Sequence, residues 1–378
     1  MTTVLPLQME SIMLDLLVVH CPVGGGHKAA ASALVEAATM RGQRAKLVDL
    51  FALVPRIVGD AYVTTHLEWT ARSPETYGEA YFGSNYRGGA FEPLRLAWDR
   101  VVFRALLDEV ARENPRAIVA THHLPLVVLG RARRKGLLQT PVTGVVTDYT
   151  AHAVWAERGV DAFCVGSRLP HEELVNHGVD GRRVVRTGIP VREAFERVPV
   201  ARASGPLRVL VTSGGFGVGP LVNTVRSFAG VPDVELTVVC GKSEGLVDAT
   251  RAICAEHRIR AEVVAFESNM PARLAAADVV VGKAGGLTVS ETLTARRPMI
   301  VVGAIPGNEM LNEAFVVGGG AGIASDASSV GATFTALRAE HRLAAMAERA
   351  SLLVKSHASA NVLAVAGSLV AAEAARAA

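Results

Sequence analysis

Short runs of valine, isoleucine and leucine alternate with longer amphipathic segments along the whole chain. The runs are apolar at successive positions, which is typical of strands in a parallel sheet that is covered on both faces. The expected strands are Leu14–His20, Ala117–Thr121, Val142–Thr147, Leu207–Thr212, Glu235–Val239, Ala261–Ala265, Asp278–Val281 and Met299–Val302. The segments between them have helical periodicity, as in Lys28–Arg41, Pro220–Phe228, Leu246–His257 and Leu287–Arg296. This repeated order of strand and helix predicts an α/β protein with doubly wound sheets.

The alternation is interrupted once, in residues 187–206, which contain three prolines and two glycines. A chain of 378 residues is too long for one ordinary core and suits two domains of about 150–200 residues. We therefore expect a first domain over residues 1–190, a linker over 191–206 and a second domain over 207–378 that ends in alanine-rich helices. Two such domains face each other across a cleft, where ligands tend to bind.

Composition and charge exclude several classes of protein. Half of the residues are apolar and 20% are charged, which argues against a disordered, collagen-like or disulfide-scaffold protein. The net charge of +3 is too small for a dedicated nucleic-acid binder. None of the four cysteines belongs to a C-x-x-C pair, so we expect neither a disulfide framework nor a zinc site, and a reducing cytoplasm is the expected location.

Neither a signal peptide nor a membrane span is expected. The first twenty residues have no basic leader, and Glu10 and Asp15 interrupt their apolar run. The nearest candidate for a span, Ala360–Ala372, is shorter than the roughly 18 apolar residues required and contains Asn361 and Ser368. The chain is thus expected to be soluble, or to lie on a membrane without crossing it.

Three consecutive glycines follow the first expected strand and lead into a helix. Glycine lets the backbone turn sharply and approach a ligand, so Gly25 and Gly26 are candidate ligand contacts. His27 follows in the first helical turn, where the partial positive charge of the helix disfavours imidazolium. A histidine that is neutral near pH 7 can accept a proton, which makes His27 a candidate general base. The alternative is a plain turn with a surface histidine.

A second glycine-rich loop, residues 213–220, follows the strand that opens the second domain. Its backbone N–H groups, at Gly214, Gly215 and Gly217, are suited to cradle a phosphate or diphosphate. A dinucleotide fingerprint would require glycine at position 220, where this chain has Pro220, and no G-K-[ST] sequence ends the loop. The loop is therefore neither a NAD fingerprint nor a Walker motif. A turn that binds nothing is the alternative.

A third loop, which begins at Gly282, also joins a strand to a helix. Its helix N-terminus offers an anion site, with Lys283 available as a point charge. Glu291 lies about one turn further along, where a carboxylate can accept hydrogen bonds from both hydroxyls of a ribose. A solvated helix glutamate is the alternative.

Polar residues also follow two other strands. Asn308, Glu309 and Asn312 suit hydrogen bonds to sugar hydroxyls, although an N-cap for the helix 308–317 explains the first of them equally well. Asp148 and His152 lie at the ligand-facing edge of the first sheet. Two possible ligands do not make a metal site, so no metal is expected.

Aromatic residues are concentrated in the segment Tyr62–Tyr86 of a chain that is otherwise poor in them. We expect loops and short helices here, with Trp69 and Tyr81 among the side chains that form an apolar entry for a hydrophobic acceptor. Ordinary packing is the alternative explanation.

The order of these motifs resembles the monogalactosyldiacylglycerol synthase and processive diacylglycerol glucosyltransferase family, to which the N-acetylglucosaminyltransferase that completes lipid II is related. The resemblance spans nearly the whole chain. Its motifs include G-G-G-H-K, V-T-D-Y-T-A-H, T-G-I-P-V, S-G-G-F-G-V-G-P-L, K-A-G-G-L-T-V-S-E and I-P-G-N-E. It implies two facing Rossmann-like domains (the GT-B fold) and an inverting, metal-independent transfer from a UDP-sugar to a lipid hydroxyl, with no cofactor. It also implies peripheral contact with the inner face of the plasma membrane.

The resemblance implies specific roles for residues of both domains. His27 would deprotonate or orient the acceptor hydroxyl, with Asp148 in support and Gly25, Gly26, Trp69 and Tyr81 near the acceptor. In the second domain the glycines of the second loop would hold the diphosphate, Phe266–Met270 the uracil, Gly285–Thr288 the phosphates, Glu291 the ribose and Asn308–Glu309 the sugar. The implied donor contacts are Gly214, Gly215, Gly217, Phe266, Met270, Lys283, Gly285, Gly286, Leu287, Thr288, Glu291, Asn308 and Glu309.

Two departures leave the substrates open. Phe216 replaces a small or acidic residue of the relatives, and Asn308 replaces the glutamine usual in galactosylating relatives. A lipid-linked or hydrophobic secondary metabolite is an alternative acceptor. A UDP-sugar 2-epimerase is an alternative enzyme of the same architecture, and a nucleotide-sugar sensor is a non-enzymatic one.

Overall fold

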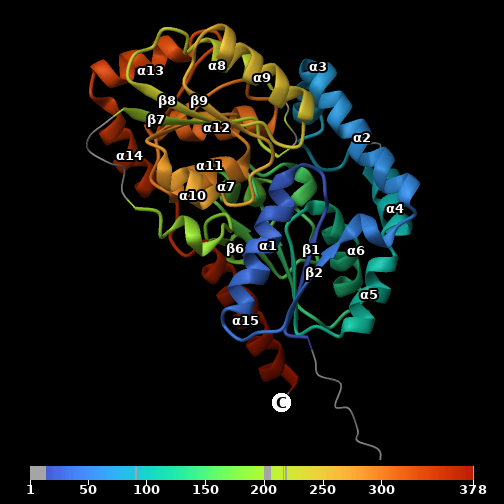
Figure 1. Ribbon diagram of the computed structural model, residues 1–378. Coiled ribbons are helices and arrows are strands. Elements are labelled where there is room, and N and C mark those ends of the chain that lie inside the picture. Colours follow the sequence, from blue (N-terminus) through green and yellow to red (C-terminus); the bar gives the residue numbers. More distant parts are fainter. Residues whose placement is uncertain (1–13, 90–91, 200–205, 216, 218, 378) are drawn as a thin grey trace, which may run out of the picture.

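The computed structural model describes residues 14–89, 92–199, 206–215, 217 and 219–377 (Figure 1). Most of the N-terminal segment on which the signal-peptide prediction rests, and also Phe216, lie outside the described residues. The structure has two parallel six-stranded sheets, each with helices on both faces, and thereby confirms the predicted GT-B architecture.

The first sheet has the strand order β2-β1-β3-β4-β5-β6, and every pairing is parallel. Its strands are β1 (Leu16–His20), β2 (Ala45–Asp49), β3 (Ala117–Ala120), β4 (Val142–Val145), β5 (Ala162–Val165) and β6 (Val184–Arg186). Alternate residues of β1 point to opposite faces, so that Val18 packs toward α1 (Gly25–Thr39) and Val19 packs toward α5 (Ala105–Glu113) and α6 (His123–Arg134). The fully apolar strands are thus buried on both sides, as the sequence predicts.

The second sheet has the order β12-β11-β10-β7-β8-β9, the strand order of the dinucleotide-binding fold. Its strands are β7 (Leu207–Thr212), β8 (Val234–Val239), β9 (Ala261–Val264), β10 (Val279–Gly282), β11 (Met299–Val301) and β12 (Gly322–Ala324). Its helices are α8 (Leu221–Arg226), α9 (Glu244–Glu256), α10 (Met270–Ala276), α11 (Gly286–Thr294), α12 (Asn308–Gly318), α13 (Val330–Ala339) and α14 (Arg342–Leu353).

In each sheet the order in which the strands are added reverses at one point. The loops after the two strands at this switch point run to opposite faces of the sheet and leave a crevice between them. In the first sheet this point lies between β1 and β3, and in the second it lies between β7 and β10. The loops that follow these four strands contain His27, Thr121, the second glycine loop and Lys283. The topology therefore places the predicted chemistry where an open α/β sheet binds ligands.

The aromatic segment differs from the expected loops and short helices. It forms two consecutive helices, α2 (Arg56–Arg72) and α3 (Pro74–Gly83), and α4 (Glu92–Val102) and α7 (Arg168–Asn176) complete the helices of the first domain. Helix α3 reaches the second domain, because a Cβ on Gly78 would lie 2.5 Å from the Pro306 side chain. The segment is therefore also part of the boundary between the domains.

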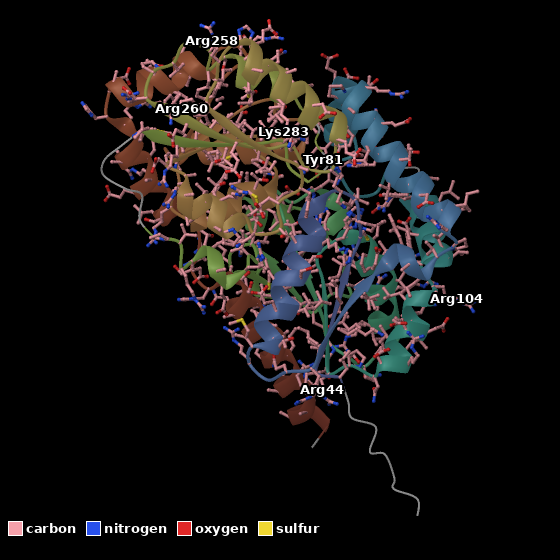
Figure 2. All side chains as sticks on the ribbon, in the orientation of Figure 1. Arg44, Tyr81, Arg104, Arg258, Arg260 and Lys283 are labelled. Atoms are coloured by element: carbon pink, nitrogen blue, oxygen red, sulfur yellow. The ribbon has the colours of Figure 1, made fainter. Side chains whose placement is uncertain are left out.

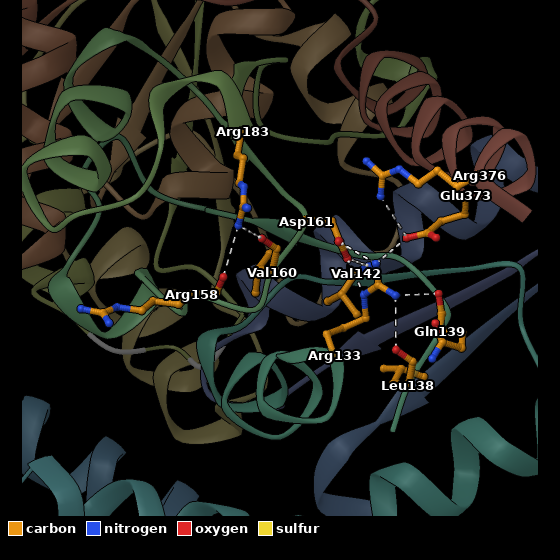
Figure 3. Close-up of polar contacts among 10 residues, drawn as sticks. All are labelled: Arg133, Leu138, Gln139, Val142, Arg158, Val160, Asp161, Arg183, Glu373 and Arg376. Carbon is orange, nitrogen blue, oxygen red and sulfur yellow. Dashed lines mark hydrogen bonds and ion pairs between the residues drawn. The ribbon is translucent and has the colours of Figure 1, made fainter. Parts of the chain in front are cut away.

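The last helix, α15 (Ala358–Ala377), belongs to the first domain rather than to the second, where the predicted boundaries place it. Its Val362 and Ala366 are buried with Val18 of β1 and Val119 of β3. Arg133 of α6 fixes its far end, with Nη2 2.6 Å from Glu373 Oε1 and 2.8 Å from Asp161 Oδ1 (Figure 3). The chain thus crosses between the domains twice.

The segment Arg342–Arg376 is long and apolar enough to span a membrane by length and composition alone, with 28% of its most apolar window buried. No such segment is expected from the sequence. In the structure it consists of two helices, α14 and α15, which are separated at residues 354–357. The apolar face of α15 covers the first sheet.

Candidate active site

His27 lies in the first turn of α1, directly above the end of β3. Its Nδ1 is 2.7 Å from the carbonyl oxygen of Thr121 and 2.9 Å from Thr147 Oγ1. A carbonyl oxygen can only accept, so Nδ1 carries the hydrogen and Nε2 has the free electron pair. Burial holds the pKa of His27 below its usual value, although the nearby Asp148 carboxylate and the bond to Thr121 oppose the shift. The ring is therefore neutral at pH 7, with Nε2 able to accept a proton.

Two further histidines pack against this base. The His122 ring is 4.6 Å from the His27 ring in an edge-on arrangement and stacks on His123 at 4.3 Å. His122 is buried, and its Nδ1 accepts a hydrogen bond from the backbone N–H of Leu124. Burial lowers the pKa of both rings well below the usual value. Both rings are therefore neutral at pH 7.

Asp148 lies near His27 but makes its hydrogen bonds to the second domain. Its Oδ1 accepts from Asn308 Nδ2 at 3.2 Å and from Asn312 Nδ2 at 2.8 Å. Within the described residues no hydrogen bond joins Asp148 to His27, and Thr147 occupies the position at Nδ1. Any support from Asp148 is therefore electrostatic.

Asn312 does not have the role that the sequence suggests. Its side chain is fully buried, Nδ2 also donates to Ala284 O at 2.9 Å, and Oδ1 accepts from the backbone N–H of Tyr149 at 2.7 Å. Both amide hydrogens are thus used, and full burial keeps the amide oxygen away from a sugar hydroxyl. Asn312 is a structural link between the domains.

The second glycine loop and the loop after β10 enclose a small pocket at the second switch point. Its lining includes Ser213, Gly219, Pro220, Gly282 and Lys283. Gly214 and Gly217 have φ angles of 73° and 70°, values that favour glycine. These angles turn the backbone of the loop back toward the sheet end.

Lys283 and Glu309 form an ion pair above this pocket. Lys283 Nζ lies 3.2 Å from Glu309 Oε1, and both side chains are largely buried. Glu309 Oε2 accepts from the backbone N–H of Ile305 and so closes the loop before α12. Two residues predicted to contact the phosphates and the sugar thus contact each other, and Figure 2 labels Lys283.

Glu291 lies on α11, and its carboxyl has no hydrogen bond or ion pair with any residue that the structure describes. Burial raises the pKa of its carboxyl to about 7, with Arg192 opposing the shift. The N-terminus of the same helix lies at Gly285 and Gly286, and Thr288 Oγ1 is 3.9 Å from the Cβ position of Gly285. The Glu291 side chain keeps an intermediate exposure, so a ligand can reach its carboxyl.

The residues predicted to contact the base of the nucleotide differ in exposure. Phe266 is 57% exposed, and the Lys242 ammonium lies 5.7 Å from the centre of its ring. Met270 begins α10 and packs against the core of the second domain. The ring of Phe266 is thus accessible to a flat ligand.

Comparisons with known proteins agree with this geometry. The family model of monogalactosyldiacylglycerol (MGDG) synthase matches residues 27–191, and that of the glycosyltransferase family 28 C-terminal domain matches residues 208–360. Together they cover both domains. The chain is a glycosyltransferase whose first domain matches the monogalactosyldiacylglycerol synthase model.

Individual relatives support this assignment. The processive diacylglycerol β-glucosyltransferase of Bacillus cereus (strain AH187) is 25% identical over 345 residues, which are 88% of each chain. MurG of Acinetobacter baumannii has a similar fold, with a TM-score of 0.64 at 17% identity over 94% of this chain and 99% of that one. The UDP-GlcNAc 2-epimerase of Neisseria meningitidis, solved with UDP-GlcNAc, has a TM-score of 0.59 at 10% identity, over 93% of this chain and 99% of that one.

In this glycosyltransferase the predicted acceptor residues lie at the boundary between the domains. The Tyr81 ring is 4.8 Å from the His152 ring and approaches Gly307, which precedes α12. Gly26 faces Leu287, whose Cδ2 is 3.4 Å from the Cβ position of the glycine, whereas Gly25 faces open space.

Trp69 lies further out, on the exposed side of α2. Its Nε1 donates to Thr76 Oγ1 at 2.9 Å, and its ring meets Tyr77 edge-on. Trp69 and Tyr81 are joined through Tyr77, whose ring is 6.4 Å from that of Tyr81. The aromatic chain runs from the exposed face of α2 toward the site.

Sequence reasoning missed the roles of three residues. Thr121 and Thr147 orient His27, and Tyr149 is buried in the second domain. The available signal was their position immediately after strands β3 and β4, where side chains reach the ligand edge of the sheet. No three His, Cys, Asp or Glu side chains in the described part of the chain are arranged to hold a metal ion.

Proposed function

We propose that the protein transfers a sugar from a UDP-sugar to a hydroxyl of a diacylglycerol-like lipid, with inversion at the anomeric carbon. The single observation that carries the proposal is the position of His27. Its Nε2 is a free proton acceptor on the first domain, while Gly26, which precedes it, contacts Leu287 at the donor loop of the second domain. The named relatives act on diacylglycerol and on UDP-linked sugars.

The donor would bind the second domain. The backbone at Gly215 and Gly219 and the N-terminus of α11 supply partial positive charge for a diphosphate. Glu291 is one helical turn away and supplies a carboxylate for two vicinal ribose hydroxyls. The exposed ring of Phe266 provides a face for the base.

The transfer would be a single displacement. The acceptor oxygen attacks the anomeric carbon from the face opposite to UDP, the bond from that carbon to the UDP oxygen breaks, and the acceptor proton passes to Nε2 of His27. Holding both substrates in one cleft contributes up to roughly 7–11 kcal/mol in well-oriented cases. A positioned base contributes about 10²–10⁴-fold, and backbone dipoles stabilise the charge that develops on the departing diphosphate.

The acceptor would come from a membrane surface beside α4. Leu94, Trp98 and Val101 recur at helical spacing on one face of α4 and are 70%, 64% and 76% exposed. Arg104 lies exposed next to this face, and Figure 2 labels it at the edge of the molecule. A helix face with apolar side chains and neighbouring basic residues suits an anionic bilayer surface. The aromatic chain from Trp69 through Tyr77 to Tyr81 would guide the lipid toward His152 at the domain boundary.

The geometry favours transfer over epimerisation. An epimerase needs acidic groups free to act at the sugar, whereas Glu309 is paired with Lys283 and Asp148 is bonded to two asparagines. Incubation with UDP-GlcNAc alone is therefore expected to produce no epimer, as followed by proton NMR.

The proposal is tested by incubating the protein with UDP-glucose or UDP-galactose and vesicles that contain diacylglycerol. We expect a glycolipid whose anomeric configuration is opposite to that of the donor. A thermal-shift series with UDP-, dTDP- and GDP-sugars is expected to show stabilisation by the UDP-sugars. Absence of transfer from every donor to diacylglycerol, or a retained configuration, would contradict the proposal. Small hydrophobic alcohols serve as competing acceptors.

A further inference from the structure

Three consecutive residues after β4, Thr147 to Tyr149, connect the first domain to two helices of the second. We propose that this connector positions His27 against the donor-binding helices and that Tyr149 is its anchor. The catalytic consequence rests on the proposed function. The proposed role of Tyr149 in holding the two domains together does not rest on that function, because it is tested on the protein without any substrate.

The first member of the connector touches both the base and the donor side. Thr147 Oγ1 lies 2.9 Å from His27 Nδ1. Its carbonyl oxygen lies against Gly286, the first residue of α11, so closely that a Cβ on this glycine would overlap it. A shift of α11 relative to the first sheet must therefore also move the residue that orients His27.

The second member holds the start of α12. Asp148 Oδ1 accepts hydrogen bonds from Asn308 and Asn312, which lie one turn apart on that helix. Asn312 in turn binds Ala284 O and the backbone N–H of Tyr149. The buried amide is thereby bonded to both domains, and removing any partner would leave a buried polar group unsatisfied.

The third member is inserted into the core of the second domain. The Tyr149 ring stacks on Phe315 of α12, with centroids 3.9 Å apart and planes 10° from parallel. Its hydroxyl lies 3.0 Å from Ser290 Oγ, which itself donates to Gly286 O, so that the tyrosine is the donor. Tyr149 is only 1% exposed, although the rest of its strand and loop belong to the first domain.

These contacts link the base to both donor helices through one short, rigid segment. Ser290 is the neighbour of Glu291 on α11, and Phe315 shares α12 with Asn308 and Glu309. Loss of the Tyr149 anchor is expected to let the domains rotate about their two connections. A displacement of about 1 Å at the reacting atoms can lower turnover about 100-fold.

The test uses Tyr149→Leu and Phe315→Leu, which remove the two halves of the stack. The matched control is Phe334→Leu, since Phe334 packs on Phe228 inside the second domain at 5.8 Å. We expect small-angle X-ray scattering of the substrate-free protein to give a larger radius of gyration for both anchor variants and an unchanged value for the control. We expect kcat of the anchor variants to fall about 100-fold. Their affinity for UDP, measured by calorimetry, is expected to equal that of the wild type.

A folded Tyr149→Leu protein with the wild-type scattering curve and kcat would overturn the inference. If that variant does not fold, Phe315→Leu decides the question from the other side of the stack. A loss of UDP affinity equal to the loss of kcat would also count against a positioning role. A wild-type protein that transfers no sugar contradicts the proposed function instead, and leaves the scattering comparison valid.

Discussion

Burial shifts the pKa values of two site residues in opposite directions: that of His27, the proposed base, and that of Glu291, the carboxyl proposed to bind the ribose. Burial disfavours charge, so it lowers the pKa of His27 and raises that of Glu291. His27 is consequently neutral when it must accept a proton. Glu291 is close to half protonated at pH 7 until a ligand donates hydrogen bonds to it.

Replacing His27 by alanine is expected to lower kcat by about 10²–10⁴-fold, because the proton acceptor is lost. UDP affinity is expected to stay unchanged, because the donor contacts lie on the second domain. Since the pKa of the wild-type imidazole is lowered, kcat/KM should fall only as the pH drops below about 6.5. Steady-state kinetics across pH check both points. The control is His257→Ala, at the end of α9, and a fully active His27→Ala enzyme would refute the base assignment.

Replacing Glu291 by glutamine is expected to weaken the binding of a UDP-sugar and to remove its pH dependence. Ribose hydroxyls favour the charged carboxyl, so wild-type affinity should fall by up to about tenfold per pH unit below 7. A UDP-sugar is the right probe, because its diphosphate does not titrate there. Calorimetry from pH 5.5 to about 8 measures the trend.

The unliganded protein supplies a second readout for Glu291. Its raised pKa means that its contribution to stability is fully present below about pH 4.5 and is lost as the pH rises through 7. The glutamine variant should lack this trend. Glu256→Gln on α9, an exposed glutamate, is the matched control. Equal affinities of wild type and Glu291→Gln at pH 8 would exclude the ribose contact.

At the scale of elements, long apolar strands are predictable, and very short strands or strands of mixed polarity are not. All eight expected strands are present within two residues of their predicted ends. Four strands were missed, β2, β5, β6 and β12. Strand β2 mixes polar and apolar residues, while β5, β6 and β12 have only three or four residues each. Three of the four lie at sheet edges, whereas β5 is an interior, buried strand that is too short for its pattern to stand out.

Helix α4 has an exposed apolar face that predicts binding to anionic vesicles. Trp98→Glu is expected to reduce sedimentation with such vesicles at least about tenfold. The substitution replaces a large apolar side chain, which would be buried in the bilayer surface, by a charged one that stays in water. Transfer to a detergent-dispersed acceptor should change little, since α4 does not contact His27. Leu137→Glu, at an equally exposed leucine on the first domain, is the control. Unchanged vesicle binding by Trp98→Glu would remove α4 from the membrane contact.

At the scale of the whole molecule, contacts between distant segments were beyond the reach of sequence patterns. The site loops could be predicted because each follows a strand within a few residues. The partners of Asp148 lie 160 and 164 residues away on another domain, and no local signal identifies them. The same holds for α15, whose helical pattern is clear while its position on the first sheet depends on Val362 and Ala366.

The attachment of α15 gives the last prediction. Arg133 is largely buried and binds Asp161, Glu373 and two backbone carbonyls, so Arg133→Ala removes several hydrogen bonds and two ion pairs at once (Figure 3). We expect a loss of about 2–3 kcal/mol in unfolding free energy and faster hydrogen exchange along α15. Glu373→Ala breaks a partly exposed pair and should cost about 1 kcal/mol or less. Arg376→Ala, at a largely exposed arginine, should change neither quantity. If Arg133→Ala leaves exchange in α15 unchanged, apolar packing alone holds the helix on the first domain.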